Sequence, residues 1–240
     1  MAKVANTHAI QQCSSLLSPR QLGVGVRGGC EAAVYAARSY LEGCSPGEGI
    51  LKIDYKNAFN CVRWGVVLDA VAEHLPDLLP FVSSSYASPS RLLFGEFVVA
   101  SGEGVQQGDP LGPLLFCLAI AGVFGAIEGD LVMGYLDDIT IGGNVEDLIS
   151  LVLKIEVSSS LLGLTLNRSK CEFVGRGAEF EAVIASSALG VLIRDWNEAG
   201  LLGSPLSVEG VSGVLVEGCA NLCRLTMRLQ FLSRHESCFS

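Results

Sequence analysis

The sequence predicts an α+β fold in which helices pack on one face of an antiparallel sheet. Short apolar runs alternate along the chain with segments whose apolar residues recur at helical spacing. Two of the short runs are separated only by Asp137 and Asp138, which is the spacing of a tight hairpin. Parallel strands would need a long crossover at this point, so the strand order favours an antiparallel sheet with added helices.

The first half of the chain predicts two helices, a buried strand and a hairpin. Apolar positions at helical spacing indicate a helix over 30–41, ended by Gly43, and a second helix over 64–75. Between them, the apolar run 49–53 is typical of a buried strand. Residues 89–100 alternate loosely, which predicts a hairpin with its turn near Gly95 and Glu96.

The second half predicts an apolar helix over 110–127, begun by Pro110, and then the hairpin strands 131–136 and 139–141. A helical stripe over 145–162 follows, and the apolar residues of 164–173 indicate a further strand or hairpin. The tail from Leu215 to Phe239 is also expected to be helical.

The uncharged segment 110–127 requires a membrane test, because its 18 residues reach the lower limit of a transmembrane helix. The segment contains two Pro and three Gly, and acidic rather than basic residues flank it. We therefore expect a core helix and no membrane partner, with the membrane span as the alternative.

Composition excludes several classes of protein. Half of the 240 residues are hydrophobic and only 17% are charged, which excludes a disordered chain. The nine cysteines are scattered without a C-x-x-C pair, which argues against a zinc site or a disulfide framework. We expect reduced thiols in an intracellular protein of the nucleus or cytoplasm, because residues 1–19 do not form a secretory signal.

The informative acidic residues are Asp54, at the end of an apolar strand, and the pair Asp137 and Asp138 in the predicted hairpin. Carboxylates beside buried strands are costly unless a partner neutralises them, and neighbouring carboxylates repel. Magnesium prefers such oxygen ligands, and two ions about 3.5–4 Å apart would suit a phosphoryl displacement. The alternative is an exposed pair in a turn together with an unrelated aspartate at a strand end.

The charge pattern bears on the same question. The formal net charge is −9, and no Lys or Arg lies between Arg91 and Lys154. This balance argues against nucleic-acid binding through the protein's own cations, so bound metal ions would have to supply the positive charge. The glycine-bracketed loop 104–110 precedes the apolar helix, where it could approach a flat ligand closely or simply form a turn.

Three segments in this order resemble the reverse transcriptases of non-LTR retroelements: 52–60 (KIDYKNAFN), 104–113 (GVQQGDPLGP) and 135–138 (YLDD). Three further segments add to the resemblance, which runs from about residue 19 to residue 205: 21–25 (QLGVG), 163–172 (GLTLNRSKCE) and 201–205 (LLGSP). The resemblance implies a right-hand polymerase palm whose fingers and thumb are incomplete. It further implies an RNA-directed DNA polymerase that adds dNTPs to a primer 3′-hydroxyl.

The resemblance assigns a role to each candidate residue. Asp54, Asp137 and Asp138 would be the catalytic residues and the ligands of two Mg²⁺ ions, for which Mn²⁺ could substitute. The nucleotide site would comprise Tyr55, through its carbonyl, with Phe59, Gln107, Gly108 and Lys170. Phe59 would exclude a ribose 2′-hydroxyl, or else be only a core residue. Leu202 and Gly203 would form the primer grip. The implied partners are an RNA template, a DNA primer and dNTPs.

The resemblance also implies a division into domains. Residues 1–48 would be a remnant of the fingers with the first palm helix, 49–205 the palm, and 206–240 the helical start of a thumb. Few basic residues precede the first predicted helix, and Gly112 stands where the family usually has a Ser. These departures predict a truncated copy with impaired substrate holding. The alternative is a catalytically inert retroelement remnant that keeps the palm fold as an interaction module or has no function.

Overall fold

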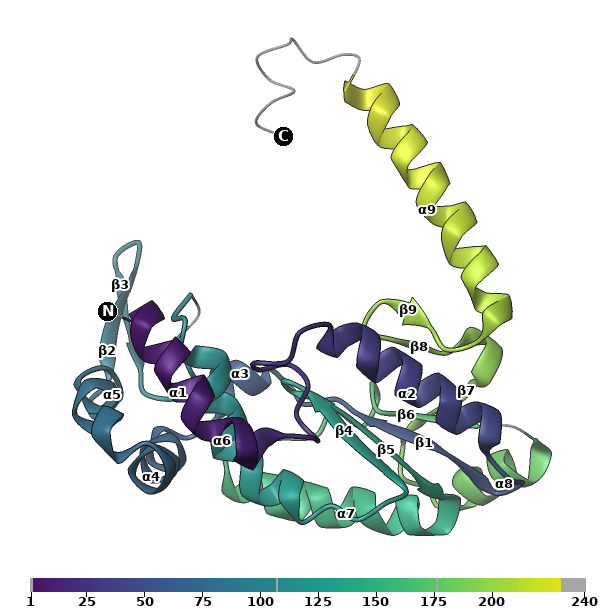
Figure 1. The fold of residues 1–240 in the computed structure, drawn as a ribbon, viewed down its shortest axis with the longest axis horizontal. Helices are drawn as coiled ribbons and strands as arrows, with labels where there is room; N and C mark the ends of the chain where they lie inside the picture. The colour runs from purple at the N-terminus through teal and green to yellow at the C-terminus, as the bar shows by residue number, and fades with distance from the viewer. Residues whose placement is uncertain (1, 107, 176, 230–240) are drawn as a thin grey trace. The chain divides into compact units, whose positions relative to one another are not determined.

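The computed structural model describes residues 2–106, 108–175 and 177–229, and the chain divides into two compact units after Arg194 (Figure 1). The first unit is built on a five-stranded sheet in the order β4-β5-β1-β6-β7. The strands are β1 (Glu48–Ile53), β4 (Leu131–Tyr135), β5 (Asp138–Asn144), β6 (Glu172–Gly175) and β7 (Leu192–Asp195). β1 pairs antiparallel with both β5 and β6, and β4 pairs antiparallel with β5. The predicted α+β class with an antiparallel sheet is therefore confirmed.

Helices α6 (Gly112–Gly125) and α7 (Val145–Leu161) lie on one face of this sheet, where a Cβ added to Gly134 of β4 would meet Phe124 of α6. A Cβ added to Gly143 of β5 would meet Leu148 of α7, whereas one added to Gly142 would meet Tyr40 of α2 (Gly29–Gly43). Successive strand residues point to opposite faces, so α2 lies on the other face.

The apolar helix α6 is the centre of the main core. It is buried nearly all round, as expected of a helix that is hydrophobic on every side. It contacts α1 (Ala2–Leu17) and α4 (Trp64–His74), and α4 contacts α5 (Leu79–Tyr86). Among the described residues, no helix has both the length and the apolar character that crossing a membrane requires. The prediction that 110–127 contains a core helix is confirmed.

The structure confirms most of the elements predicted from periodicity. The hairpin of β2 (Ser90–Phe94) and β3 (Phe97–Ser101) turns at Gly95 and Glu96, as expected. The sequence analysis missed α1, α5 and α8 (Ala178–Ser186). Two short helices complete the unit, namely α3 (Ala58–Cys61) and the 3₁₀ helix η1 (Pro76–Leu78).

Helix α1 was missed because most of its buried face is formed by small residues. Ala9, Cys13 and Leu17 recur at helical spacing and are all buried. Ala and Cys contribute little apolar surface, so their periodicity stands out less than that of Leu or Val.

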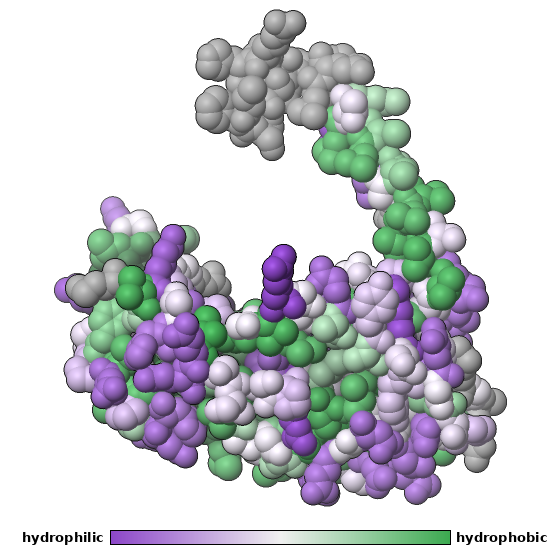
Figure 2. All heavy atoms as spheres, viewed as in Figure 1, coloured by the Kyte–Doolittle hydropathy of each residue, from purple (hydrophilic) through white to green (hydrophobic). Residues whose placement is uncertain are grey.

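The second unit contains the 3₁₀ helix η2 (Trp196–Glu198), a hairpin of β8 (Gly200–Leu201) and β9 (Ser204–Pro205), and the long helix α9 (Val208–Leu229). The indole Nε1 of Trp196 donates to the carbonyl of Leu206, 2.9 Å away. Hydrophobic side chains are exposed along α9, where they form apolar surface visible in Figure 2. The tail was predicted to be helical to Phe239, but residues 230–239 lie outside the described part.

Candidate active site

Strand pairing brings Asp54 and Asp138 to the same end of the sheet. Ile53, the last residue of β1, pairs with Ile139 of β5, so Asp54 follows directly beside Asp138. The turn between β4 and β5 consists of Leu136 and Asp137, and Asp138 is the first residue of β5 and pairs with Tyr135. The hairpin therefore turns one residue earlier than the sequence predicted, because Leu136 adopts a left-handed backbone conformation with φ of 59°.

The three carboxylates influence one another electrostatically. Desolvation, together with the charge of Asp54, raises the pKa of Asp137 above its usual range. Desolvation and the charges of Asp137 and Asp54 also raise the pKa of Asp138, against a smaller opposing influence of Lys52. Both shifts mean that the negative charge is held unfavourably at this end of the sheet. A bound cation would remove this cost.

A short turn after α7 holds the backbone of Asp54. The backbone N–H of Asn167 donates to the carbonyl of Asp54 at 2.8 Å, and the Sγ of Cys171 lies 3.4 Å from the backbone N of Asp54. The guanidinium of Arg168 in the same turn forms two hydrogen bonds with the carboxylate of Glu156 on α7. Lys170, one residue before Cys171, is exposed. The turn thus connects Lys170 to the strand end that carries Asp54.

Tyr55 and Phe59 follow Asp54 directly along the chain. Tyr55 forms an isolated bridge with Leu166 whose hydrogen bonds use the carbonyl of Asp54 and the N–H of Lys56, so the bridge leaves the carbonyl of Tyr55 unused. The phenol of Tyr55 is buried against Ser159, with 2.8 Å between the two oxygens. Burial raises the pKa of Tyr55 to about 12, so the phenol remains protonated at neutral pH.

The ring of Phe59 on α3 stacks on Phe116 of α6, with ring centroids 4.5 Å apart. The N–H of Val105 donates to the carbonyl of Phe59 at 2.7 Å, which attaches the loop 104–110 to α3. A side chain at Gly104 would collide with the backbone of Asn60, so this contact requires a glycine. Gly108 is exposed with φ of 87°, and Gln107 lies outside the described residues.

Leu202 and Gly203 belong to the second unit, where they form the two-residue turn between β8 and β9. Both have positive φ, 49° for Leu202 and 79° for Gly203. This combination is typical of a type I′ hairpin turn. The three aspartates belong to the first unit.

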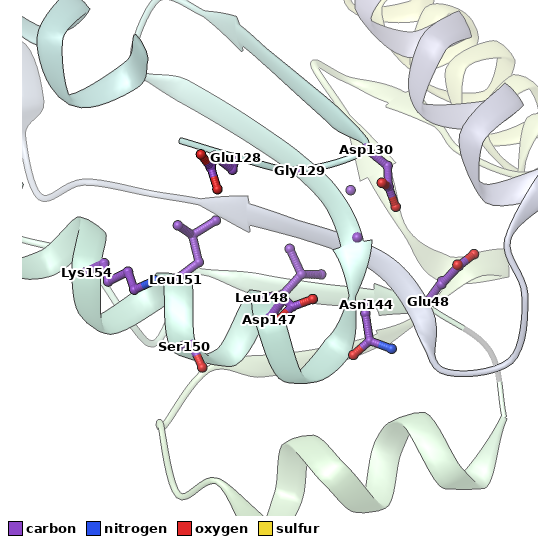
Figure 3. Close-up of a pocket in the computed structure, with 12 residues that line it drawn as sticks. Glu48, Glu128, Gly129, Asp130, Asn144, Asp147, Leu148, Ser150, Leu151 and Lys154 are labelled. Carbon is purple, nitrogen blue, oxygen red and sulfur yellow. The ribbon is translucent and has the colours of Figure 1, made fainter. Parts of the chain in front are cut away.

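A pocket of about 500 Å³ lies at the other end of the sheet (Figure 3). Its acidic lining includes Glu48, Glu128, Asp130 and Asp147, with Lys154 as its basic residue. Glu48 begins β1 whereas Asp54 follows its end, a separation of about 20 Å along an extended strand. The acidic segment between Arg91 and Lys154 is therefore divided, with Asp137 and Asp138 at one end of the sheet and the pocket residues at the other.

The donor set of Asp54, Asp137 and Asp138 fits magnesium, since all three offer carboxylate oxygens and their mutual repulsion favours a divalent cation. Within the described ranges, no group of three His, Cys, Asp or Glu side chains is arranged to coordinate a metal ion by itself. Magnesium commonly binds one or two carboxylates and takes its other ligands from water and substrate phosphates.

Comparison with known proteins identifies the family. The model of the family described as reverse transcriptase (RNA-dependent DNA polymerase) matches residues 3–192, well over half of the chain. The chain belongs to the reverse transcriptase family. No curated protein matches the sequence of this reverse transcriptase family member.

Solved telomerase structures share its fold. Apo telomerase from Candida Tropicalis has a TM-score of 0.57 and 12% identity, over 74% of this chain and 37% of that chain. Telomerase from Candida albicans, solved with a fragment of telomeric RNA, has a TM-score of 0.55 and 13% identity, over 71% of this chain and 35% of that chain. The chain thus spans about a third of those telomerases, and the likeness concerns the fold alone.

In this reverse transcriptase family member, the sequence did not reveal the residues that contact the site from distant positions in the chain. Gln21 was noted only as part of a motif, although its side chain contacts the turn before Asp137. Cys171 and Asn167, which contact Asp54, were likewise only parts of a motif. No local pattern marks such roles, because their partners are 113 to 117 residues away in the chain.

Proposed function

We propose that this chain is the palm of an RNA-directed DNA polymerase of the non-LTR type, which adds dNTPs to a primer 3′-hydroxyl paired to an RNA template. The observation that carries this proposal is the convergence of Asp54 with Asp137 and Asp138 at one end of adjacent strands in a chain of the reverse transcriptase family. Retroelement origin rests on the sequence resemblance.

In this proposal, Asp54, Asp137 and Asp138 hold two Mg²⁺ ions, and the carbonyl of Tyr55 adds a ligand. The ions would activate the attacking hydroxyl and neutralise the leaving phosphates. Strand β1 and the β4–β5 hairpin fix the backbones of the three aspartates, so the carboxylates would hold the two ions in defined positions. Desolvation and mutual repulsion raise the pKa values of Asp137 and Asp138, and a bound divalent cation would stabilise the ionised carboxylates against both effects.

The remaining candidates act on the substrate. Phe59, held by its stack on Phe116, limits the space beside the sugar and so favours a dNTP. Gln107 and Gly108 contact the incoming nucleotide and the template base. Lys170 donates a proton from Nζ to the leaving pyrophosphate. Leu202 and Gly203 hold the primer terminus.

The testing experiment is extension of a labelled DNA primer on an RNA template in Mg²⁺. Asp137→Asn is expected to reduce the rate roughly 10³-fold or more, as removal of a catalytic group does in other enzymes. Asp130→Asn is the matched control, because Asp130 lies at the pocket on the other end of the sheet. Equal rates for wild type and Asp137→Asn would refute the proposed site.

A specific observation favours a second candidate function, a non-catalytic palm that acts as an interaction module. Several cations that could contact nucleic acid are used within the protein. Arg20 binds carbonyls at the end of α6, Arg168 binds Glu156, and Lys52 and Arg194 both bind Glu172. The net charge of −9 adds to this deficit.

Binding to an RNA–DNA hybrid across a salt series separates the two functions. Each phosphate contact changes log K by about 0.9 per unit of log salt for duplex DNA. We expect a shallow slope and weak extension, with retained Mg²⁺ binding. A steep slope with processive synthesis would overturn the interaction module, and absence of any Mg²⁺ effect on the folded protein would support it.

A further inference from the structure

The side chain of Gln21 grips the turn that precedes Asp137. Its amide oxygen accepts from the backbone N–H of Leu136 at 2.8 Å, and its amide nitrogen donates to the carbonyl of Leu136 at 3.1 Å. The same amide oxygen also accepts from the N–H of Gly23 at 2.9 Å. Gln21 is only 2% exposed, so these bonds are made away from water.

The backbone conformation of Leu136 requires stabilisation by other residues. Its φ of 59° lies in the left-handed region, which a residue with a Cβ adopts only at a cost. Turn residues of this conformation are usually Gly, Asn or Asp. The amide of Gln21 bonds both backbone groups of Leu136 in this conformation, so the two hydrogen bonds offset part of its cost. The next residue along the chain is Asp137.

The segment that carries Gln21 is itself anchored beside the hairpin. The N–H of Leu22 donates to the carbonyl of Gly134 at 2.7 Å, and the N–H of Gly134 donates to the carbonyl of Arg20 at 2.8 Å. The guanidinium of Arg20 donates to the carbonyls of Phe124, Gly125 and Ile127 at the end of α6. The neighbours of Gln21 therefore attach its segment to both β4 and the end of α6.

Gly23 completes this contact. A Cβ at position 23 would lie 2.7 Å from the backbone N of Leu136, closer than real Cβ contacts allow. A side chain there would push the turn away from Gln21. The absence of a side chain at Gly23 and the amide of Gln21 thus serve the same close approach.

We propose that Gln21 is a positioning residue that holds Leu136 in its left-handed conformation and thereby aims the carboxylate of Asp137. This inference rests on the proposed function, in which Asp137 acts in polymerisation. Gln21 itself touches neither substrate nor metal. Its effect on the reaction runs through the conformation of one turn.

The decisive experiment combines Gln21→Met with Leu136→Gly. Methionine keeps the length of the side chain and removes all three hydrogen bonds. We expect kcat to fall on the order of 10²-fold, because small displacements of reacting groups have effects of this size, with a much smaller change in the KM for dNTP. Glycine adopts the left-handed conformation freely, so the double variant should recover most of kcat.

Two controls separate positioning from general destabilisation. Gln11→Met alters an exposed glutamine of α1 and should leave kcat unchanged. Gly23→Ala introduces a Cβ that would displace the turn from Gln21, so it should reproduce the loss of kcat seen with Gln21→Met. If Gln21→Met fails to fold, Gly23→Ala decides, and an unchanged kcat in Gly23→Ala would then overturn the proposal. A double variant no better than Gln21→Met, or an unchanged kcat in that single variant, would overturn the proposal.

A second readout does not depend on polymerisation. Hydrogen exchange at the amide of Leu136, measured by NMR, should be at least about tenfold faster in Gln21→Met than in wild type, because its acceptor is lost. An unchanged exchange rate at Leu136 in Gln21→Met would refute the proposal that Gln21 holds this turn. If wild type shows this protection but does not extend primers, the proposed function fails and the role of Gln21 in holding the turn stands.

Discussion

The rings of Phe59 and Phe116 are stacked, with centroids 4.5 Å apart and planes inclined by 20°. Phe59 lies five residues after Asp54, on the short helix α3, and Phe116 lies on the buried helix α6. The stack connects the candidate nucleotide site to the most apolar helix of the core. The proposed selection of the sugar requires a ring with a fixed position, and the stack on Phe116 holds the ring of Phe59 in place.

Phe59→Ala should therefore weaken discrimination against ribonucleotides. We expect the ratio of kcat/KM for dNTP over NTP to fall about 10- to 100-fold, because the loss of one apolar side chain changes selectivity by this amount. Stability should fall by about 1–3 kcal/mol through the lost stack. Phe59→Tyr keeps the ring and is the control. Unchanged selectivity in Phe59→Ala would leave Phe59 as a core residue only.

Asp137→Asn should stabilise the protein at neutral pH in the absence of divalent cations. Because folding raises the pKa of Asp137, its contribution to stability is present below the ordinary value of 3.8 and is lost as pH rises through the folded value. Asparagine carries no such charge. Thermal unfolding should show a higher Tm for the variant at pH 7 and equal values at acidic pH.

Magnesium should reverse this order. A cation bound by the folded carboxylates raises the Tm of wild type and has less effect on Asp137→Asn. Titration with Mg²⁺, monitored by thermal unfolding, measures the difference. Equal Mg²⁺ shifts in both proteins would contradict a metal role for Asp137.

Glu172→Gln should lower stability at neutral pH. Burial acts to raise the pKa of Glu172, but the hydrogen bonds and charges of Lys52 and Arg194 outweigh it and hold the pKa below 4.5. The resulting stability is present above 4.5 and is lost as pH falls through the lowered folded value. We expect a loss of about 1 kcal/mol at pH 7 in urea unfolding.

The pH dependence provides the check on Glu172. The stability difference between wild type and Glu172→Gln should shrink as the pH falls below 4.5. Glu42→Gln, an exposed change on α2, should show no difference at either pH. A constant difference across pH would mean that Glu172 acts through packing rather than through its charge.

Trp64→Phe should loosen the loop 104–110. The buried indole Nε1 donates to the carbonyl of Gly104 at 2.6 Å, and phenylalanine would leave this carbonyl without its donor. We expect a loss of about 1–3 kcal/mol in urea unfolding and faster proteolysis within the loop. Tyr35→Phe, an exposed change, is the control. Unaltered loop proteolysis would contradict this anchoring role.

The sequence by itself determined the parts of the fold that depend on local chemistry. Helix α2 and the turn of the β2–β3 hairpin at Gly95 and Glu96 appear where periodicity and turn residues predicted them. The reverse transcriptase family was likewise readable from ordered motifs. Helical spacing and turn preferences act over a few residues, so a sequence displays them directly.

Only the tertiary structure decided how distant residues share the site. It moved the β4–β5 turn to Leu136 and Asp137, assigned Arg20 to the end of α6, and placed α2 on the opposite face from α7. It also joined Gln21 to Leu136 across 115 residues. Such pairings depend on which strands lie together, and the energy that selects a left-handed Leu136 exists only after β4, β5 and the segment of Gln21 have met.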